Sequence, residues 1–460
     1  MKKLLLLTAL WCIGVAYSFA DETFRYKDPQ NVVWICSPTN DVDETAVGLC
    51  VEITGVKGCG TEVEVPGTVY DKAGTACTVV KLSKVFCENT ELQKVTLPTS
   101  VTILDGTFNG CTALTTVENT SQISKIGEKT FYGTHISSID LPVCTSVGDN
   151  AFNGCTSLTS ANLPVCTSVG CGAFACCSLR TSMKLPACTT VGDSAFFACD
   201  GLFEIDLPVC KTIGELAFST CMNLTSVKLP ACTSVGEWAF ISCTRLTSAN
   251  LPVCTTVGYG AFYCCPKLRS IDLPECTTVG DYAFYWCDYL TSIDLSSLES
   301  IDSYAFKGYT SLTSIKISSC KSVGECAFSG CYSLTNIDLP SSVTSIGKSA
   351  FEGCSGLTRI YVRWETPLSI DATVFSGVDK QKCTLYVPDC YYWDYKDAAY
   401  WGEFENIVEY NVTGIDSPSA GNGATETARY SANGQRVTAP VKGLNIVKYS
   451  DGSTRKVVVK

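Results

Sequence analysis

Histidine is almost absent from this chain of 460 residues, which contains only His135. One histidine cannot form a multi-histidine metal site and leaves little scope for histidine-based hydrolysis. The sequence also has no Cys-x-x-Cys spacing, which zinc and thioredoxin-like sites favour. We therefore predict no catalytic, metal-binding or cofactor-binding residue, and no enzymatic activity.

Positive charge is scarce as well. The chain has 34 Lys and Arg residues against 45 Asp and Glu residues, a formal net charge of −11. Nucleic acids and anionic membranes are recognised by basic surfaces, so neither is expected as a partner. The composition is 46% hydrophobic, which is enough to build a long core.

Long apolar runs are missing, apart from Leu4 to Val15 near the start of the sequence. That run is too short for a comfortable membrane span, and it follows the basic residues Lys2 and Lys3. Ser18-Phe19-Ala20 provides small residues at a cleavage site. Residues 1–20 are therefore predicted to be a secretory signal peptide, and the protein is expected to be exported, without a transmembrane segment.

Phenylalanine recurs every 22 residues in the middle of the chain, and two cysteine columns keep the same step. The phenylalanines are Phe152, Phe174, Phe196, Phe218, Phe240, Phe262, Phe284, Phe306 and Phe328. A fixed period of this size predicts a solenoid. Within one unit, Leu158 to Leu179, two extended pieces are followed by a turn at Gly170 and a short helical turn that starts at Ala173.

Units such as Leu224-Thr-Ser-Val-Lys-Leu-Pro-Ala-Cys-Thr-Ser-Val-Gly-Glu-Trp-Ala-Phe240 resemble the leucine-rich repeats of the BspA-like class. The resemblance covers residues 81–375 and implies a solenoid of short parallel strands with compact return turns. Members of this class are adhesion and host-interaction proteins of the cell surface. The resemblance therefore implies binding of host or bacterial surface proteins or glycans.

The segments that flank the array are expected to cover its ends. Residues 21–80 alternate apolar and polar residues and predict a β-rich cap of short antiparallel strands. Residues 376–410 resemble the closing segment of such arrays, with an amphipathic helix near Tyr391 to Phe404. Residues 411–428 are rich in Gly, Ser, Ala and Thr, which indicates a flexible linker.

The last segment, residues 429–460, contains strand-like stretches and an Asn433-Gly434 hairpin signal. It is similar to the C-terminal sorting domains of the type IX secretion system, which are small β-sandwiches. The resemblance implies export across an outer membrane to the cell surface.

The cysteine columns allow two interpretations, disulfide or metal chemistry and simple packing of a small buried hydrophobe. In the unit around Phe306 the two column positions hold Leu298 and Tyr309, which form neither disulfides nor metal sites. We therefore favour reduced packing thiols. The off-column cysteines are the better candidates for exposed or paired thiols: Cys171, Cys176, Cys264 and Cys326.

Acidic residues follow the turn glycine in many units: Glu128, Asp149, Asp193, Glu215, Glu237, Asp281 and Glu325. One interpretation is a calcium-binding stripe. The alternative, which we favour, is that each carboxylate caps the amides of its own short helical turn.

Aromatic residues gather in four consecutive units, at return-turn positions that elsewhere are small or polar. They form the candidate binding patch: Trp238, Tyr259, Tyr263, Tyr282, Tyr285, Trp286, Tyr289, Tyr304 and Tyr309. Exposed Tyr and Trp on a rigid scaffold suit a binding hot spot, although the same rings can also fill grooves between turns.

The sequence thus predicts a secreted or cell-surface leucine-rich repeat protein that acts as a binding module or adhesin. A structural surface-layer component is one alternative. A carbohydrate hydrolase that uses a pair of Asp and Glu carboxylates is another, although the repeats supply no unique pair.

Overall fold

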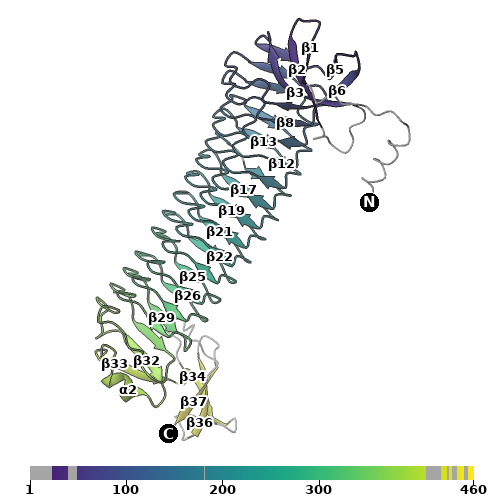
Figure 1. Cartoon of the computed structure of the whole chain (residues 1–460). Coiled ribbons are helices and arrows are strands. Elements are labelled where there is room, and N and C mark those ends of the chain that lie inside the picture. Colours follow the sequence, from purple (N-terminus) through teal and green to yellow (C-terminus); the bar gives the residue numbers. More distant parts are fainter. Residues whose placement is uncertain are drawn as a thin grey trace, which may run out of the picture.

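A computed structural model describes residues 23–39, 49–180, 182–410, 426–431, 435–437, 443–449 and 454–459. Figure 1 shows one elongated solenoid, with a β-rich cap at the N-terminal end and the helix α2 at the other. The predicted repeat solenoid is therefore confirmed. The signal-peptide prediction for residues 1–20 lies outside the described residues.

Each coil of the solenoid, one 22-residue repeat, contributes two short strands to two parallel ladders. The first ladder contains β9 (Thr116–Glu118), β11 (Ser138–Asp140), β13 (Ser160–Asn162), β15 (Met183–Lys184), β17 (Glu204–Asp206), β19 (Ser226–Lys228), β21 (Ser248–Asn250), β23 (Ser270–Asp272), β25 (Ser292–Asp294), β27 (Ser314–Lys316), β29 (Asn336–Leu339) and β31 (Arg359–Val362). Within its paired segments, residues 22 apart lie side by side, as Asp206 and Lys228 do, and the step is 23 residues between β29 and β31.

The second ladder is more continuous and pairs without interruption as far as β24. It contains β8 (Ile103–Asp105), β10 (Lys125–Ile126), β12 (Ser146–Val147), β14 (Ser168–Val169), β16 (Thr190–Val191), β18 (Thr212–Ile213), β20 (Ser234–Val235), β22 (Thr256–Val257), β24 (Thr278–Val279), β26 (Ser300–Ile301), β28 (Ser322–Val323) and β30 (Ser345–Ile346). Both extended pieces expected in each unit are therefore present.

The phenylalanine column forms the axis of the core. Its rings, from Phe86 to Phe375, are buried and stack on one another at centroid separations of 5.0 to 5.9 Å. A tryptophan covers each end of the column: Trp34 lies 6.2 Å from Phe86, and Trp401 lies 5.4 Å from Phe375. No coil buries its own ring alone, because each ring faces the rings of both neighbours.

The return segment of each coil is a pair of tight turns, so the expected short helical turn is wrong. In one coil the amides of Ala173 and Ala175 donate to carbonyls three residues earlier, while Phe174 donates to Ala195 of the next coil at 2.7 Å. Cys176 has a φ of 58°, in the left-handed region that a helix does not use. In this segment the backbone hydrogen bonds to the next coil take the place of the hydrogen bonds of a helix.

The N-terminal cap is built on β1 (Phe24–Lys27), β2 (Val33–Pro38) and β3 (Cys50–Lys57), which pair in antiparallel fashion. The strand β5 (Thr68–Tyr70) is also antiparallel to β6 (Ala76–Ser83). However, β3 is parallel to β6, and β4 (Glu62–Glu64) is parallel to β7 (Lys94–Thr96). The purely antiparallel expectation is therefore wrong, since coil-like pairing begins inside the cap.

The C-terminal end of the solenoid continues the first ladder through β32 (Thr384–Pro388) and β33 (Asn406–Tyr410). Between them α2 (Tyr392–Asp397) is much shorter than the helix expected up to Phe404. Trp401 and Phe404 are buried, but they come from the turn that follows the helix. Rings delivered by a turn can reach Phe375 from the side of the last coil.

The last segment forms one antiparallel sheet in the order β35-β34-β36-β37. Its strands are β34 (Glu426–Ser431), β35 (Arg436–Val437), β36 (Gly443–Tyr449) and β37 (Thr454–Val459). The predicted strands are present, and the described residues form a single sheet and not two packed sheets. The Asn433-Gly434 turn lies outside the described residues.

Candidate functional site

The aromatic residues of four consecutive coils form a connected network of rings at the return turns. Trp238 packs edge-to-face on Tyr259 and Tyr263, at 4.8 and 5.4 Å between centroids. Tyr263 continues the network to Tyr285 and Trp286, at 5.3 and 5.5 Å. Seven of the nine predicted rings therefore form one contiguous network, and Tyr289 and Tyr309 are not part of it.

The network ends at Tyr304, which stacks on Tyr282 at 5.5 Å with an angle of 7° between the rings. Trp238, Tyr282, Trp286 and Tyr304 all have positive φ values, between 55° and 62°. Bulky residues adopt this left-handed backbone only where the surrounding structure holds them, here in the tight turns of the repeat. The turns thus fix the direction of these side chains.

A glycine makes room for the largest ring of the network. Gly260 occupies the same left-handed turn position, and a Cβ atom there would lie 2.3 Å from Cε3 of Trp238. The indole of Trp238 therefore lies directly against the bare backbone of the next coil.

Two residues of the patch are strongly exposed: 50% of Trp286 and 55% of Tyr289 are accessible to solvent. The others are half-buried by their ring neighbours, with one exception. Tyr309 is fully buried, lies edge-to-face on Phe306 at 5.7 Å, and cannot contact a ligand. The assignment of Tyr309 to the patch is therefore wrong, because its position in the repeat is the core cysteine column.

Charged groups border the patch on both sides. The Arg269 guanidinium lies 5.5 Å from the Tyr289 ring centroid, and the Lys307 ammonium lies 5.0 Å from that of Tyr304. Burial raises the pKa of Tyr259, and the negative charges of nearby groups, Asp281 among them, raise it further. The surface is therefore aromatic at its centre, with both signs of charge at its rim.

The acidic residues after the turn glycine join neighbouring coils. Oδ1 of Asp149 accepts the amide of Cys171 at 2.8 Å, and Oδ1 of Asp193 accepts that of Glu215 at 2.8 Å. These bonds cross to the next coil, so capping of a helical turn within the same unit is wrong for them. No group of three His, Cys, Asp or Glu side chains that could hold a metal ion is found in the described part of the chain.

The two cysteine columns are ladders of free thiols. In the second column each Sγ donates to the carbonyl of the phenylalanine one coil earlier, as Cys199 does to Phe174 at 3.0 Å and Cys221 to Phe196 at 3.1 Å. In the first column the acceptor lies two residues ahead, as for Cys144 and Ser146 at 3.2 Å. The thiols therefore pack and also satisfy backbone carbonyls, a role that the sequence did not suggest.

Burial makes thiols such as those of Cys144 and Cys221 poor nucleophiles. It raises the pKa of Cys144 and of Cys221 to about 12, so almost no thiolate is present at neutral pH. The off-column cysteines behave differently: Cys171 and Cys176 are exposed, and Cys264 and Cys326 are half-exposed. All four are free thiols in the structure.

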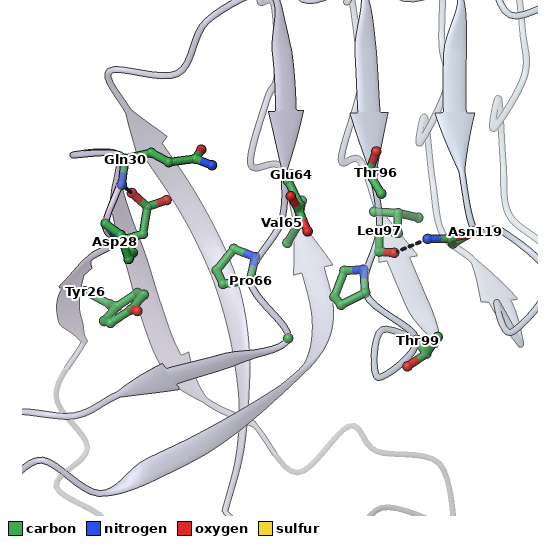
Figure 2. A pocket seen from close by; sticks show the side chains of 13 residues that line it. Tyr26, Asp28, Gln30, Glu64, Val65, Pro66, Thr96, Leu97, Thr99 and Asn119 are labelled. Atoms are coloured by element: carbon green, nitrogen blue, oxygen red, sulfur yellow. Dashed lines mark hydrogen bonds between the residues drawn. The ribbon is translucent and has the colours of Figure 1, made fainter.

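A groove that the sequence did not reveal lies between the N-terminal cap and the first coils. Figure 2 shows Tyr26, Asp28 and Gln30 on one side, with Glu64, Pro66 and Thr96 on the other. Both carboxylate oxygens of Asp28 already accept hydrogen bonds. Oδ1 accepts the backbone amides of Gln30 and Val32, and Oδ2 accepts the indole N–H of Trp34. The groove thus offers no pair of free carboxylates for glycoside hydrolysis.

The remaining titratable candidates, His135 and Asp302, lie outside this groove. The imidazole Nδ1 of His135 is 2.6 Å from the Thr112 carbonyl at the surface. Asp302 has a raised pKa because it is partly buried and lies near the Asp281 carboxylate. It belongs to a return turn and does not line the groove beside the N-terminal cap.

Comparison with known proteins agrees with this geometry. A sequence model described as "BspA type Leucine rich repeat region" matches residues 81–202, 167–289 and 277–386, in six copies. A leucine-rich repeat protein from Bacteroides ovatus ATCC 8483 is 25% identical, with a TM-score of 0.54 over 86% of this chain and 99% of that protein. No functionally curated protein matches.

Two further solved structures are similar over most of their length. A leucine-rich cell surface protein from Faecalibacterium prausnitzii A2-165 is 20% identical, with a TM-score of 0.37 over 86% of this chain and 97% of that protein. The pneumococcal vaccine antigen PcpA is 17% identical, with a TM-score of 0.43 over 85% of this chain and 99% of that protein.

Proposed function

This chain belongs to the BspA type leucine-rich repeat family, and on that premise we propose that it acts as an adhesin that binds protein or glycan ligands. The family consists of bacterial surface proteins whose repeats suggest protein binding. The aromatic patch, now without Tyr309, is the contact surface of the proposal. The observation that carries it is the contiguous ring network with half of Trp286 exposed.

Aromatic side chains suit such a surface because they supply a large apolar area at a low cost in side-chain entropy. In this chain the rings are also held in place before a ligand arrives. The single ring of Tyr263, for example, contacts three others, those of Trp238, Tyr285 and Trp286. A prearranged surface loses less conformational freedom on binding, which favours affinity.

We further propose that the protein is exported and displayed on the cell surface. The signal-like residues 1–20 and the similarity of residues 429–460 to type IX sorting domains support this. No helix among the described residues is long and apolar enough to cross a membrane. Deleting residues 429–460 should retain the protein inside the cell envelope, and normal surface display of the truncated chain would contradict the sorting role.

The test of binding compares attachment to immobilised host glycoproteins and glycans for three proteins. The double variant Trp286→Ser, Tyr289→Ser removes the two exposed rings of the patch. The control Tyr332→Ser removes a ring that is equally exposed, at 56%, but lies outside the patch. We expect the double variant to lose at least about tenfold in affinity, in the range of hot-spot residues, with little change in melting temperature.

Equal attachment by all three proteins would contradict the proposed contact surface. Self-association of the wild-type protein, without attachment to any foreign ligand, would favour the structural surface-layer alternative.

A further inference from the structure

The backbone hydrogen bonds between neighbouring coils are interrupted at one place, which we call the seam. It separates the coil that contains β23, β24 and Phe284 from the coil that contains β25, β26 and Phe306. Neither β23 with β25 nor β24 with β26 is paired, and the second ladder starts a new sheet at β26. The first ladder is broken at other places too, but the second ladder breaks only here within the described coils.

The return turns lose their bonds at the seam as well. In the preceding interface the amides of Phe262, Cys264 and Gly280 donate to the adjacent coil at 2.7 to 2.9 Å. Their equivalents one repeat later are Phe284, Trp286 and Asp302, and these fully described residues donate no backbone hydrogen bond across the seam. One interface further on, the bonds return: Phe306 donates to Ala327 at 2.8 Å.

Only side-chain contacts cross the seam. The hydroxyl of Ser297 donates to the Pro274 carbonyl at 2.7 Å, and that of Ser311 donates to the Asp288 carbonyl. Phe284 and Phe306 still stack, but their separation of 5.9 Å is the largest in the column. The two coils are thus packed against each other without the ladder that joins the others.

Asp302 lies in the turn of the coil at which these bonds are lost. It replaces the turn glycine of the repeat, whose column leaves no room for a side chain: a Cβ atom on Gly280 would lie 2.6 Å from the Tyr259 amide nitrogen. At Gly324 the nearest atom, the amide nitrogen of Ser303, would also be 2.6 Å away. At the spacing of the neighbouring coils, the Cβ atom of residue 302 would be too close to the preceding coil.

Tyr309 removes a second link. Every other cysteine of its column from Cys155 to Cys331 donates its thiol proton to the phenylalanine one coil earlier, as Cys287 does to Phe262 and Cys331 to Phe306, both at 3.2 Å. Tyr309 should reach Phe284 in the same way, but its buried hydroxyl has no hydrogen-bond partner. Two substitutions in one coil thus weaken the same interface.

We propose that the described part of the solenoid consists of two blocks, one that ends at Tyr289 and one that runs from Leu290 to Tyr410, which hinge against each other at the seam. In a repeat array each coil is stabilised mainly by its two neighbours, so the interface with the fewest bonds is where the array uncouples. The hinge is independent of the proposed binding function. It also passes through the aromatic patch, because Tyr282 and Tyr304 stack across it.

Hydrogen exchange of the full chain, read at single residues, tests the hinge. We expect the amides of Phe284, Trp286 and Asp302 to exchange at least about tenfold faster than those of Phe262, Cys264 and Gly280, because they lack hydrogen bonds to the adjacent coil. Equal protection of the two sets would overturn the proposal, and this comparison needs only the wild-type protein.

Two variants then test the cause. The double variant Asp302→Gly, Tyr309→Cys should restore slow exchange at the seam. The control Gly236→Asp should produce fast exchange at Phe218 and Thr220, whose amides bond to the coil of residue 236 in the wild type. Unchanged exchange in either variant would show that these residues do not set the hinge.

Discussion

Removing one ring from the middle of the phenylalanine column should destabilise the protein strongly. Phe218 is fully buried and stacks on Phe196 at 5.1 Å and on Phe240 at 5.2 Å, with nearly parallel planes. Truncation of a buried phenylalanine to alanine costs about 3–5 kcal/mol. Each lost ring contact adds about 0.5–1.5 kcal/mol, so Phe218→Ala should cost at least about 4 kcal/mol.

The measurement is urea denaturation followed by circular dichroism. Phe203→Ala is the matched control, because this ring lies 46% exposed on the surface of the same solenoid and should change stability by about 0.5 kcal/mol or less. A loss below about 1 kcal/mol for Phe218→Ala would refute the view that the stacked column carries the core. A two-step transition would locate the loss in the N-terminal block alone.

Alkylation of the native protein should label mainly the exposed thiols Cys87, Cys171, Cys176 and Cys390, and denaturation without reductant should release the rest. Protection that persists after denaturation would instead reveal disulfides. Tyr309→Phe should stabilise the protein by about 1–3 kcal/mol in thermal melts, since it removes a buried hydroxyl without a partner; a loss of stability would mean that the hydroxyl is bonded. Burial and the Asp281 carboxylate raise the pKa of Asp302, so its charged form destabilises the fold at neutral pH, and this penalty disappears as the pH falls through the raised pKa. Asp302→Asn should therefore raise the urea midpoint at neutral pH and leave it unchanged in acid, and an equal effect at both pH values would contradict this linkage.

The repeat made much of the fold predictable from the sequence. Because each coil packs only on its neighbours, the 22-residue step alone locates Phe218 and Cys221 in the core. The two strands of each coil followed from the same alternation of apolar and polar residues. The 22-residue period does not reveal the backbone conformation of the return turn.

The return turn escaped prediction because bonds between coils decide it. Trp238 and Tyr282 have positive φ values, which no local preference of Trp or Tyr suggests. The same limit applies to the site: the aromatic residues were found from their clustering, but Tyr309 was placed among them although its column is buried. Asp302 is visible in the sequence as a residue with a Cβ atom in a glycine column, but the sequence does not show that the ladder ends there.

The covered ends of the phenylalanine column have a consequence for how such a protein changes over generations. Trp34 meets one terminal ring, Trp401 and Phe404 meet the other, and every coil between them brings its own phenylalanine ring and turn. A gain or loss of 22 residues by unequal recombination would thus leave both ends intact. Each event would change the length of the rod by one ring spacing, 5.0 to 5.9 Å, so copy number sets the length of the rod.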